Sequence, residues 1–236
     1  MTLQPVSMQT ATEKPLVLAM TGASGAVYAV RLLQCLCNAQ VPVHLVLSPS
    51  AAIVIQQELQ IDLGPDRDRV ERLLQYCWPD VSTQSQWQPS TTPQWEENRT
   101  RITLHDYRDY MTPIASGSFL TRGMVICPCS GATLSGVVHA TGDNLIQRAA
   151  DVHLKEHRKL ILVPRETPMS VFQLENMLRA AQAGAIVLPA MPGWYHSVRS
   201  VVDLIDFVVS RILDHLHVPN TLMHRWGEQS DRGDAE

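Results

Sequence analysis

Two short turns rich in glycine and hydroxyl side chains could each bind an anion. The first, Thr21-Gly-Ala-Ser-Gly25, separates an apolar run from a helical pattern, and the second, Ser130-Gly-Ala-Thr133, has a similar setting. Glycine lets the backbone approach a ligand closely, and the N–H groups at the start of a helix favour negative charge. The first turn matches neither the G-x-G-x-x-G nor the Walker pattern, which disfavours a standard dinucleotide or ATP site. Each turn alone could equally be a tight turn or a helix cap, but the pair favours a ligand with a phosphate and a flat polar ring.

A second group of residues could hold another anionic group. Arg165-Glu166 follows an apolar run, and Lys155 lies near the end of the helical pattern before that run. Tyr195 and Arg211 come later in the chain. Several cations near one strand end would suit a phosphate, although each of them alone would more commonly form a surface salt bridge.

One pattern suggests a metal, and we reject it. His153-Leu-Lys-Glu-His157 matches the zinc pattern H-x-x-E-H. No third ligand is evident, and Arg148 and Lys155 beside it oppose a cation, so a solvated helix end is preferred. The odd set of cysteines predicts reduced thiols, mostly in the core, at Cys35, Cys37, Cys77, Cys127 and Cys129.

The hydrophobic pattern predicts strands that alternate with helices and position these residues. The predicted strands are 15–20, 41–47, 124–128, 159–164 and 185–189. The predicted helices are 26–39, 51–59, 66–78, a segment from the second turn to about 140, 143–157, 169–182 and 200–217. Thr167 is the expected N-cap of the helix at 169, with Pro168 at its first position. The pattern weakens between 60 and 111, and 82–100 is expected to be a long loop or insertion.

This order predicts a single-domain α/β fold: a Rossmann-like (flavodoxin-like) parallel sheet with helices on both faces. The folded domain is expected at 15–226, with flexible ends at 1–14 and 227–236. Ligands bind beyond the carboxyl ends of such strands. That rule selects four segments: 22–25, 48–50, 130–133 and 165–167.

Composition narrows the functional classes. The chain has 236 residues, a formal charge of −4 and no basic block, so nucleic acid is not an expected partner. Its apolar runs are far shorter than the ~20 residues of a membrane helix. Residues 1–14 lack the apolar core of a signal peptide, so we expect a cytoplasmic protein.

Taken together, these segments resemble the UbiX family of flavin prenyltransferases. The stretches that carry the resemblance are Thr21-Gly-Ala-Ser-Gly-Ala26, Pro128-Cys-Ser130 with Thr133, Asn144-Leu-Ile-Gln-Arg-Ala-Ala-Asp-Val152, Leu154-Lys-Glu156, Pro164-Arg-Glu-Thr-Pro168, Leu174-Glu-Asn-Met177, Gly193-Trp-Tyr-His196 and Arg211-Ile-Leu-Asp214. The resemblance extends from Leu16 to about Trp226, apart from the weak middle.

The resemblance implies roles for individual residues. The implied FMN-binding residues are Gly22, Ala23, Ser24, Ser48, Ser130, Gly131, Ala132, Thr133 and Arg165. The implied catalytic residues are Glu166, Lys155, Ser24 and Glu58. The implied prenyl-phosphate site consists of Tyr195, Arg211, Lys155, Arg148, Trp226 and Tyr110, with Trp226 as an aromatic wall that could come from another subunit. Tyr110 is a departure, because some members carry a second pocket Trp there.

The implied reaction is metal-independent. It joins the dimethylallyl group of dimethylallyl monophosphate, or of the diphosphate, to N5 and C6 of reduced FMN. The product is prenylated FMN for a UbiD-type decarboxylase, and the family implies a homododecamer. Two alternatives remain at this point: a flavin-dependent decarboxylase of the same superfamily, and a non-catalytic FMN-binding subunit.

Overall fold

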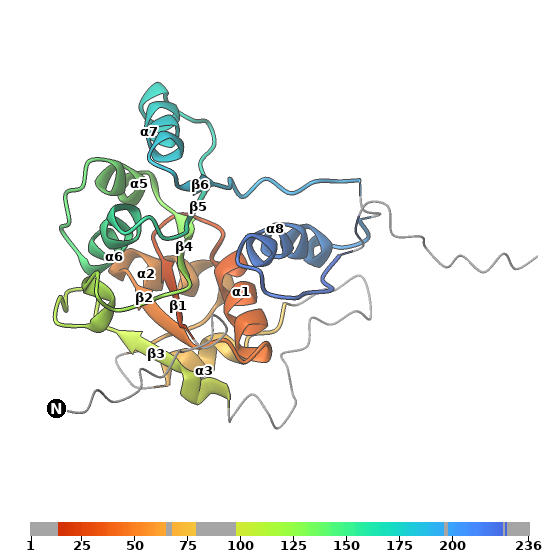
Figure 1. Cartoon of the computed structure of the whole chain (residues 1–236). Helices are drawn as coiled ribbons and strands as arrows, with labels where there is room; N and C mark the ends of the chain where they lie inside the picture. Colours follow the sequence, from red (N-terminus) through yellow and green to blue (C-terminus); the bar gives the residue numbers. More distant parts are fainter. Residues whose placement is uncertain (1–13, 65–67, 79–97, 196–197, 224, 226–236) are drawn as a thin grey trace, which may run out of the picture.

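The structure is a computed structural model, and it describes residues 14–64, 68–78, 98–195, 198–223 and 225. A six-stranded sheet forms its centre, with strand order β3-β2-β1-β4-β5-β6 and every neighbouring pair parallel (Figure 1). The strands are β1 (Leu16–Met20), β2 (Val43–Leu47), β3 (Ile102–His105), β4 (Gly123–Cys129), β5 (Leu160–Pro164) and β6 (Ile186–Val187). This is the strand order of the doubly wound Rossmann sheet, so the predicted fold class is confirmed.

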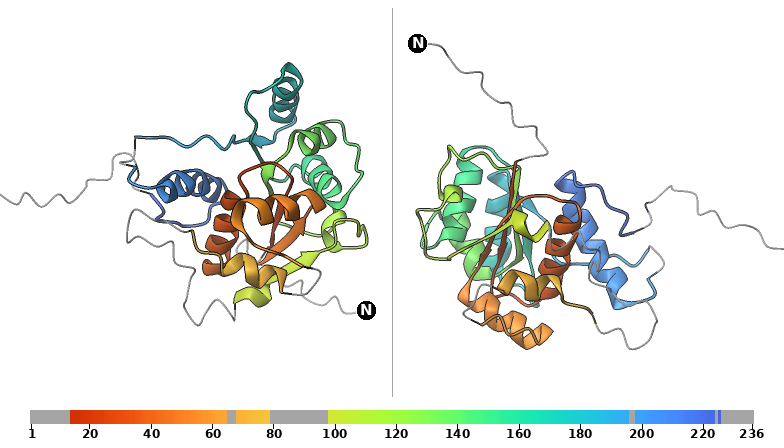
Figure 2. Two further views of the ribbon diagram at one scale, coloured as in Figure 1. Left: turned by 180° about the vertical axis from the view of Figure 1, so that it is seen from behind. Right: turned by 90° about the horizontal axis from the view of Figure 1, so that it is seen from below.

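Helices cover both faces of this sheet because its strands are apolar on both sides. Along β1, Leu16, Leu18 and Met20 belong to one core, whereas Val17 and Ala19 belong to the other. The first core is closed by α1 (Ala26–Asn38), α2 (Pro49–Leu59), α3 (Arg69–Leu74) and α8 (Val201–His215). The second is closed mainly by α5 (Gly131–Val138) and α6 (Leu145–Lys155), and Figure 2 shows the two layers on either side of the sheet.

One further helix, α7 (Val171–Gln182), stands beyond the main body next to β6 and packs against α5 (Figure 1). It begins two residues later than predicted. Ser170, not Thr167, is its N-cap: the Ser170 side chain accepts the Gln173 N–H, and the Gln173 side chain accepts the Ser170 N–H. The prediction for Thr167 was wrong because this reciprocal capping box satisfies two backbone donors at once, which a single cap does not.

The weak central region contains a strand that the sequence pattern did not predict. β3 pairs in parallel with β2, with Ile102 opposite Val43 and His105 opposite Val46. The predicted helix at 66–78 is the shorter α3. Most of the expected loop at 82–100, and both expected flexible ends apart from Lys14, lie outside the described residues, so these domain boundaries remain predictions.

No helix in the described part of the chain combines the length and the apolar character needed to span a bilayer. The carboxyl ends of β1, β4 and β5 meet at one edge of the sheet, where the chain passes into α1, α5 and the segment before α7. The carboxyl end of β2, which pairs in parallel with β1, lies at the same edge, so all four segments selected from the sequence start at neighbouring strand ends.

Candidate functional site

Hydrogen bonds join the two predicted turns at the β1 and β4 strand ends. The Thr21 hydroxyl donates to the carbonyl of Pro128 at 2.7 Å and accepts the N–H of Ser130 at 2.8 Å. Thr21 is buried, so this bridge is shielded from water. The strand order reverses direction between β1 and β4, which is where ligands of doubly wound sheets bind.

A third turn, at the start of α2, lies against the first. A Cβ on Gly22 would come within 2.5 Å of the Ser50 Cβ, so only glycine fits at position 22 without a shift. Ser48 is buried and caps α2, because its hydroxyl accepts the Ala51 N–H at 3.0 Å. The turn at 22–24 and the turn at Ser48 are therefore packed together, and the residues implied to bind FMN include members of both turns.

The N-terminus of α1 is occupied by a carboxylate of the chain itself. Gly25, in the left-handed conformation with φ 104°, is the N-cap and offers no side chain. Glu58 replaces that cap: its Oε2 accepts the N–H groups of Gly25 and Ala26, each at 2.9 Å. The sequence suggested that this helix start could bind a ligand anion, but in the structure Glu58 supplies the anion.

The turn at the start of α5 presents a second pair of hydroxyl groups. The Ser130 hydroxyl accepts the Thr133 N–H at 3.3 Å and donates to the Thr133 hydroxyl at 3.0 Å. Gly131 is half-buried, Ala132 is exposed, and Cys129 lies buried behind them. Burial raises the pKa of the Cys129 thiol to about 12, so this cysteine stays a neutral thiol at neutral pH.

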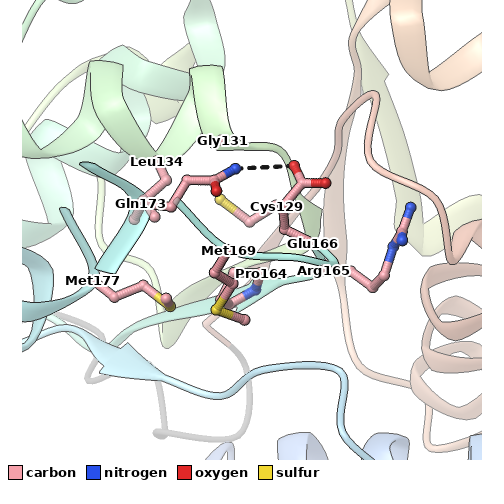
Figure 3. A pocket seen from close by; sticks show the side chains of 9 residues that line it. All are labelled: Cys129, Gly131, Leu134, Pro164, Arg165, Glu166, Met169, Gln173 and Met177. Carbon is pink, nitrogen blue, oxygen red and sulfur yellow. Dashed lines mark hydrogen bonds between the residues drawn. The ribbon is translucent and has the colours of Figure 1, made fainter. Parts of the chain in front are cut away.

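Arg165 links the β5 end to the first turn. Its Nε donates to the backbone carbonyl of Ser24 at 3.2 Å, which brings a guanidinium to the glycine turn. The neighbouring Glu166 accepts a hydrogen bond on Oε2 from Gln173 Nε2 at 3.0 Å (Figure 3). Glu166 and Gln173 line a pocket whose other walls are Cys129, Gly131, Leu134, Pro164, Arg165, Met169 and Met177.

Gln173 is a site residue that the sequence analysis missed. A signal was available, because Ser170-Val-Phe-Gln173 matches the capping-box pattern. Recognising it would have moved the helix start and placed Gln173 at the β5 end.

Lys155 does not join this site within one chain. It ends α6, five residues before β5 begins, whereas Arg165 follows the end of β5. Lys155 pairs with Glu156 at 2.5 Å, and a Cβ on Gly117 would lie 2.8 Å from its Nζ. The sequence analysis expected Lys155 near the Arg165 strand end, but α6 runs antiparallel to the strands and carries Lys155 to the opposite edge.

Arg211 also lies away from the glycine turn. It is half-exposed on α8 and pairs with Asp214 at 3.4 Å, near the helix end. That end lies beside the starts of β4 and β5, because Arg122 donates to the carbonyl of His217 at 2.5 Å and Lys159 donates to the carbonyl of His215. Lys155 and Arg211 are thus both near the amino edge, but on opposite faces of the sheet.

The other expected substrate residues are dispersed. Tyr195 is exposed, and its ring packs nearly perpendicular to that of Phe207 with centroids 5.7 Å apart. Arg148, on α6, donates to the Ala115 carbonyl and pairs with Asp151. The Tyr110 hydroxyl donates to the carbonyl of Gly142 at 2.8 Å. Trp226 lies outside the described residues.

The rejected zinc pattern is a solvated helix end at Lys155, Glu156 and His157, as expected, but its first histidine, His153, is buried and its ring is already engaged. His153 Nδ1 lies 2.7 Å from the Ala149 carbonyl, and Nε2 lies 2.8 Å from the Thr121 hydroxyl. A carbonyl can only accept, so Nδ1 carries the proton and Nε2 accepts from Thr121. Burial lowers the pKa of His153 to about 4, which keeps the ring neutral. Within the described residues no group of three or more His, Cys, Asp or Glu side chains could hold a metal ion.

Comparisons with known proteins give a consistent picture. Residues 6–213 match the family model described as Flavoprotein. A flavin prenyltransferase UbiX from Pseudomonas aeruginosa is 45% identical over 213 residues, covering 90% of this chain and 93% of the relative. The crystal structure of AnUbiX (PadA1) with FMN and dimethylallyl pyrophosphate superposes with a TM-score of 0.75 at 34% identity, covering 92% of this chain and all of that one. A dodecameric FMN-dependent Ubix-like decarboxylase from Escherichia coli O157:H7 gives a TM-score of 0.69 at 36% identity, with 90% and 98% covered.

Proposed function

The chain belongs to the UbiX family of flavin prenyltransferases, and on that premise we propose that it joins a dimethylallyl group to N5 and C6 of reduced FMN. The observation that carries this proposal is the Arg165–Ser24 hydrogen bond, which unites the β5 end with the glycine turn after β1. FMN supplies the nucleophilic ring nitrogen and carbon, and the protein supplies binding, orientation and proton transfer.

The donors at this edge fit FMN. Hydroxyl groups at Ser24, Ser48, Ser130 and Thr133 can bind the polar chain and ring edge of a flavin, and the Arg165 guanidinium can pair with a phosphate or a ring oxygen. Gly22 leaves room for close backbone approach, because its turn carries no side chain next to Ser50. Glu166 lines the pocket, and we propose that its carboxylate holds and returns a proton during ring closure.

Two of the cations expected to bind the donor phosphate, unlike Arg165, do not lie at this edge within the described part of one chain. Lys155 and Arg211 lie near the amino edge of the sheet, which the five residues of β5 separate from the carboxyl edge by about 16 Å. We propose that they act in the sites of neighbouring copies, with Tyr195, Arg148, Tyr110 and Trp226 completing the prenyl pocket there. Positive charge at that position would stabilise the departing phosphate.

Exposed apolar side chains support self-association. On α7, Val171, Phe172, Leu174 and Leu178 are between 52% and 73% exposed, and Met191 and Trp194 in the following segment are 60% and 70% exposed. So much apolar surface on one projecting helix and its neighbouring loop is typical of a subunit interface. With a dodecameric relative of the same fold, this supports a homododecamer.

The product would leave for a partner. A prenylated flavin has no further use in a site built to make it, so we propose transfer to a UbiD-type decarboxylase.

The test is a reconstitution. Purified protein is mixed without oxygen with reduced FMN and dimethylallyl monophosphate or, in a parallel sample, the diphosphate. The expected result is a flavin heavier by one five-carbon unit, formed faster from the monophosphate. Bound FMN with no change in flavin mass from either donor would contradict the proposal and favour a non-catalytic flavin-binding subunit.

A second arm concerns the donor site. Replacing Arg211 with Ala should weaken binding of the dimethylallyl phosphate. We expect the KM for this donor to rise about tenfold or more, while the affinity for FMN stays unchanged. Equal loss of FMN and donor binding would contradict the separate role given to Arg211.

A further inference from the structure

The Gln173 carboxamide connects three elements at the pocket. Gln173 lies in the first turn of α7, Glu166 follows β5, and Gly131 begins α5. Figure 3 shows the Gln173 side chain directed at the Glu166 carboxylate across the pocket. Gln173 is partly buried and so is Glu166, so the contact is sheltered from bulk water.

The orientation of this carboxamide is fixed by the backbone. Gln173 Oε1 accepts the Ser170 N–H at 2.7 Å, and an N–H can only donate. The amide nitrogen must therefore face the other way, where it donates to Glu166 Oε2 at 3.0 Å. The capping box of α7 thus sets which end of the Gln173 amide meets Glu166.

The approach of the amide to the α5 turn is also close. A Cβ on Gly131 would lie 3.2 Å from Gln173 Nε2, so a larger residue at 131 would press on the amide. Among the described residues, Gln173 is the hydrogen-bond partner of the Glu166 carboxylate. It donates to Oε2, and Oε1 accepts no hydrogen bond from these residues.

We propose that Gln173 is a positioning residue for the flavin prenylation reaction: it holds Glu166 Oε2 so that Oε1 faces the reacting flavin and prenyl group. This rests on the proposed function. A carboxylate that must take up and return one proton works best in a single rotamer, because misplacement by about 1 Å can cost orders of magnitude in rate. Gln173 removes the rotation that would exchange the two oxygens.

The experiment compares single-turnover prenylation rates in anaerobic mixtures of protein, reduced FMN and dimethylallyl monophosphate. Gln173→Met keeps the length of the side chain and removes the donor. We expect a rate about tenfold lower at saturating substrates, with FMN and donor affinities within twofold of wild type. Gln173→Asn, which retains an amide but shortens its reach, should show the same loss.

A double-mutant cycle separates positioning from packing. In a Glu166→Gln background the proton-carrying group is gone, so adding Gln173→Met should change the residual rate by less than twofold. The same tenfold loss in both backgrounds would overturn the proposal, because Gln173 would then act independently of Glu166. So would a wild-type rate for Gln173→Met.

Two controls address the helix itself. Gln182→Met makes the same chemical change at an exposed position at the other end of α7 and should leave the rate unchanged. Ser170→Ala removes the hydroxyl cap but keeps the N–H that holds Gln173 Oε1, so it should lower the thermal midpoint and leave the rate within twofold. A tenfold rate loss in Ser170→Ala would assign the effect to helix stability and overturn the proposal. If wild-type protein makes no prenylated flavin, the proposed function fails instead.

Discussion

At the scale of single residues, the contact between Gly22 and Ser50 gives the sharpest steric constraint in the site. Gly22 does not have a positive φ, so an alanine there would meet a packing problem and no backbone strain. Its Cβ would lie 2.5 Å from the Ser50 Cβ. We expect Gly22→Ala to push the start of α2 away, to lower the free energy of unfolding by about 1–3 kcal/mol and to weaken FMN binding.

A second-site change tests the cause of that loss. Ser50→Gly removes the clashing Cβ, and the next atom facing position 22 is then the Ser50 backbone carbon at an ordinary 3.6 Å. The double variant Gly22→Ala/Ser50→Gly should therefore recover most of the FMN affinity, measured by flavin fluorescence titration. Failure of this rescue would mean that position 22 matters for another reason than the contact with Ser50.

His153 makes stability depend on pH. Burial lowers its pKa to about 4, whereas the unfolded chain has an ordinary histidine near 6.5, so at intermediate pH the unfolded state binds more protons. Stability is then lost as the pH falls from about 6.5 towards 4, and His153 contributes about 2 kcal/mol of that loss by pH 5. The positive charge of Arg158 also lowers the pKa of His153.

The measurement is the free energy of unfolding at pH 7.5 and pH 5 at one protein concentration. His153→Asn should be less stable at pH 7.5 and lose less stability on acidification. A smaller acid loss should remain, because burial also lowers the pKa of His44 to about 4. An unchanged acid loss in His153→Asn would remove His153 as its source.

At the scale of elements, α1 depends on a carboxylate from α2. Gly25 cannot cap the helix with a side chain, and Glu58 Oε2 accepts the Gly25 and Ala26 N–H groups instead. We expect Glu58→Ala to cost about 1 kcal/mol of stability and Glu58→Gln about half of that, because the amide keeps an acceptor and loses the charge. Chemical unfolding in low and high salt measures both; if Glu58→Gln costs as much as Glu58→Ala, the acceptor does not contribute.

The same elements show what the sequence can and cannot predict. β1 and β5 are continuous apolar runs, buried on both faces, and such runs are recognisable without a structure. β3 is four residues long and alternates Ile-Thr-Leu-His, and its assignment depends on pairing with β2, which no local pattern reveals. The start of α7 was misplaced because Pro168 suggested a first helical position, whereas the Ser170–Gln173 capping box determines where the helix begins.

At the scale of the whole molecule, the sequence predicted the FMN-binding part of the candidate site but not the position of the cations expected to bind the donor phosphate. The glycine turn, Ser130 and Arg165 follow strands of one sheet, and the rule about carboxyl ends brings them together. Lys155 and Arg211 belong to helices that run back across the sheet. The role that the family resemblance implies for them therefore does not place them beside Arg165 in one chain. Assembly is a property of several copies, and one sequence does not state which edge meets which.

Mixed oligomers can test whether sites are shared between copies. Chains carrying Lys155→Ala and chains carrying Arg165→Ala should each be inactive alone. If Lys155 acts in the site of a neighbour, random reassembly of equal amounts should leave about a quarter of the sites with both residues intact, and prenylation should return to about that fraction of wild type. If both residues act within one chain, every site in the mixture lacks one of them and no activity returns.

The matched control uses two residues from the same edge of one chain. Arg165 donates to the Ser24 carbonyl within a chain, so an Arg165→Ala chain and a Ser24→Trp chain cannot complement each other if the site is built as proposed. Recovery in the Lys155 mixture and none in the Ser24 mixture would place the cation across the subunit boundary. Recovery in both mixtures would mean that whole turns are exchanged between copies. Recovery in neither mixture would mean that Lys155 acts in the site of its own chain. The two mixtures together therefore locate the subunit boundary within the site.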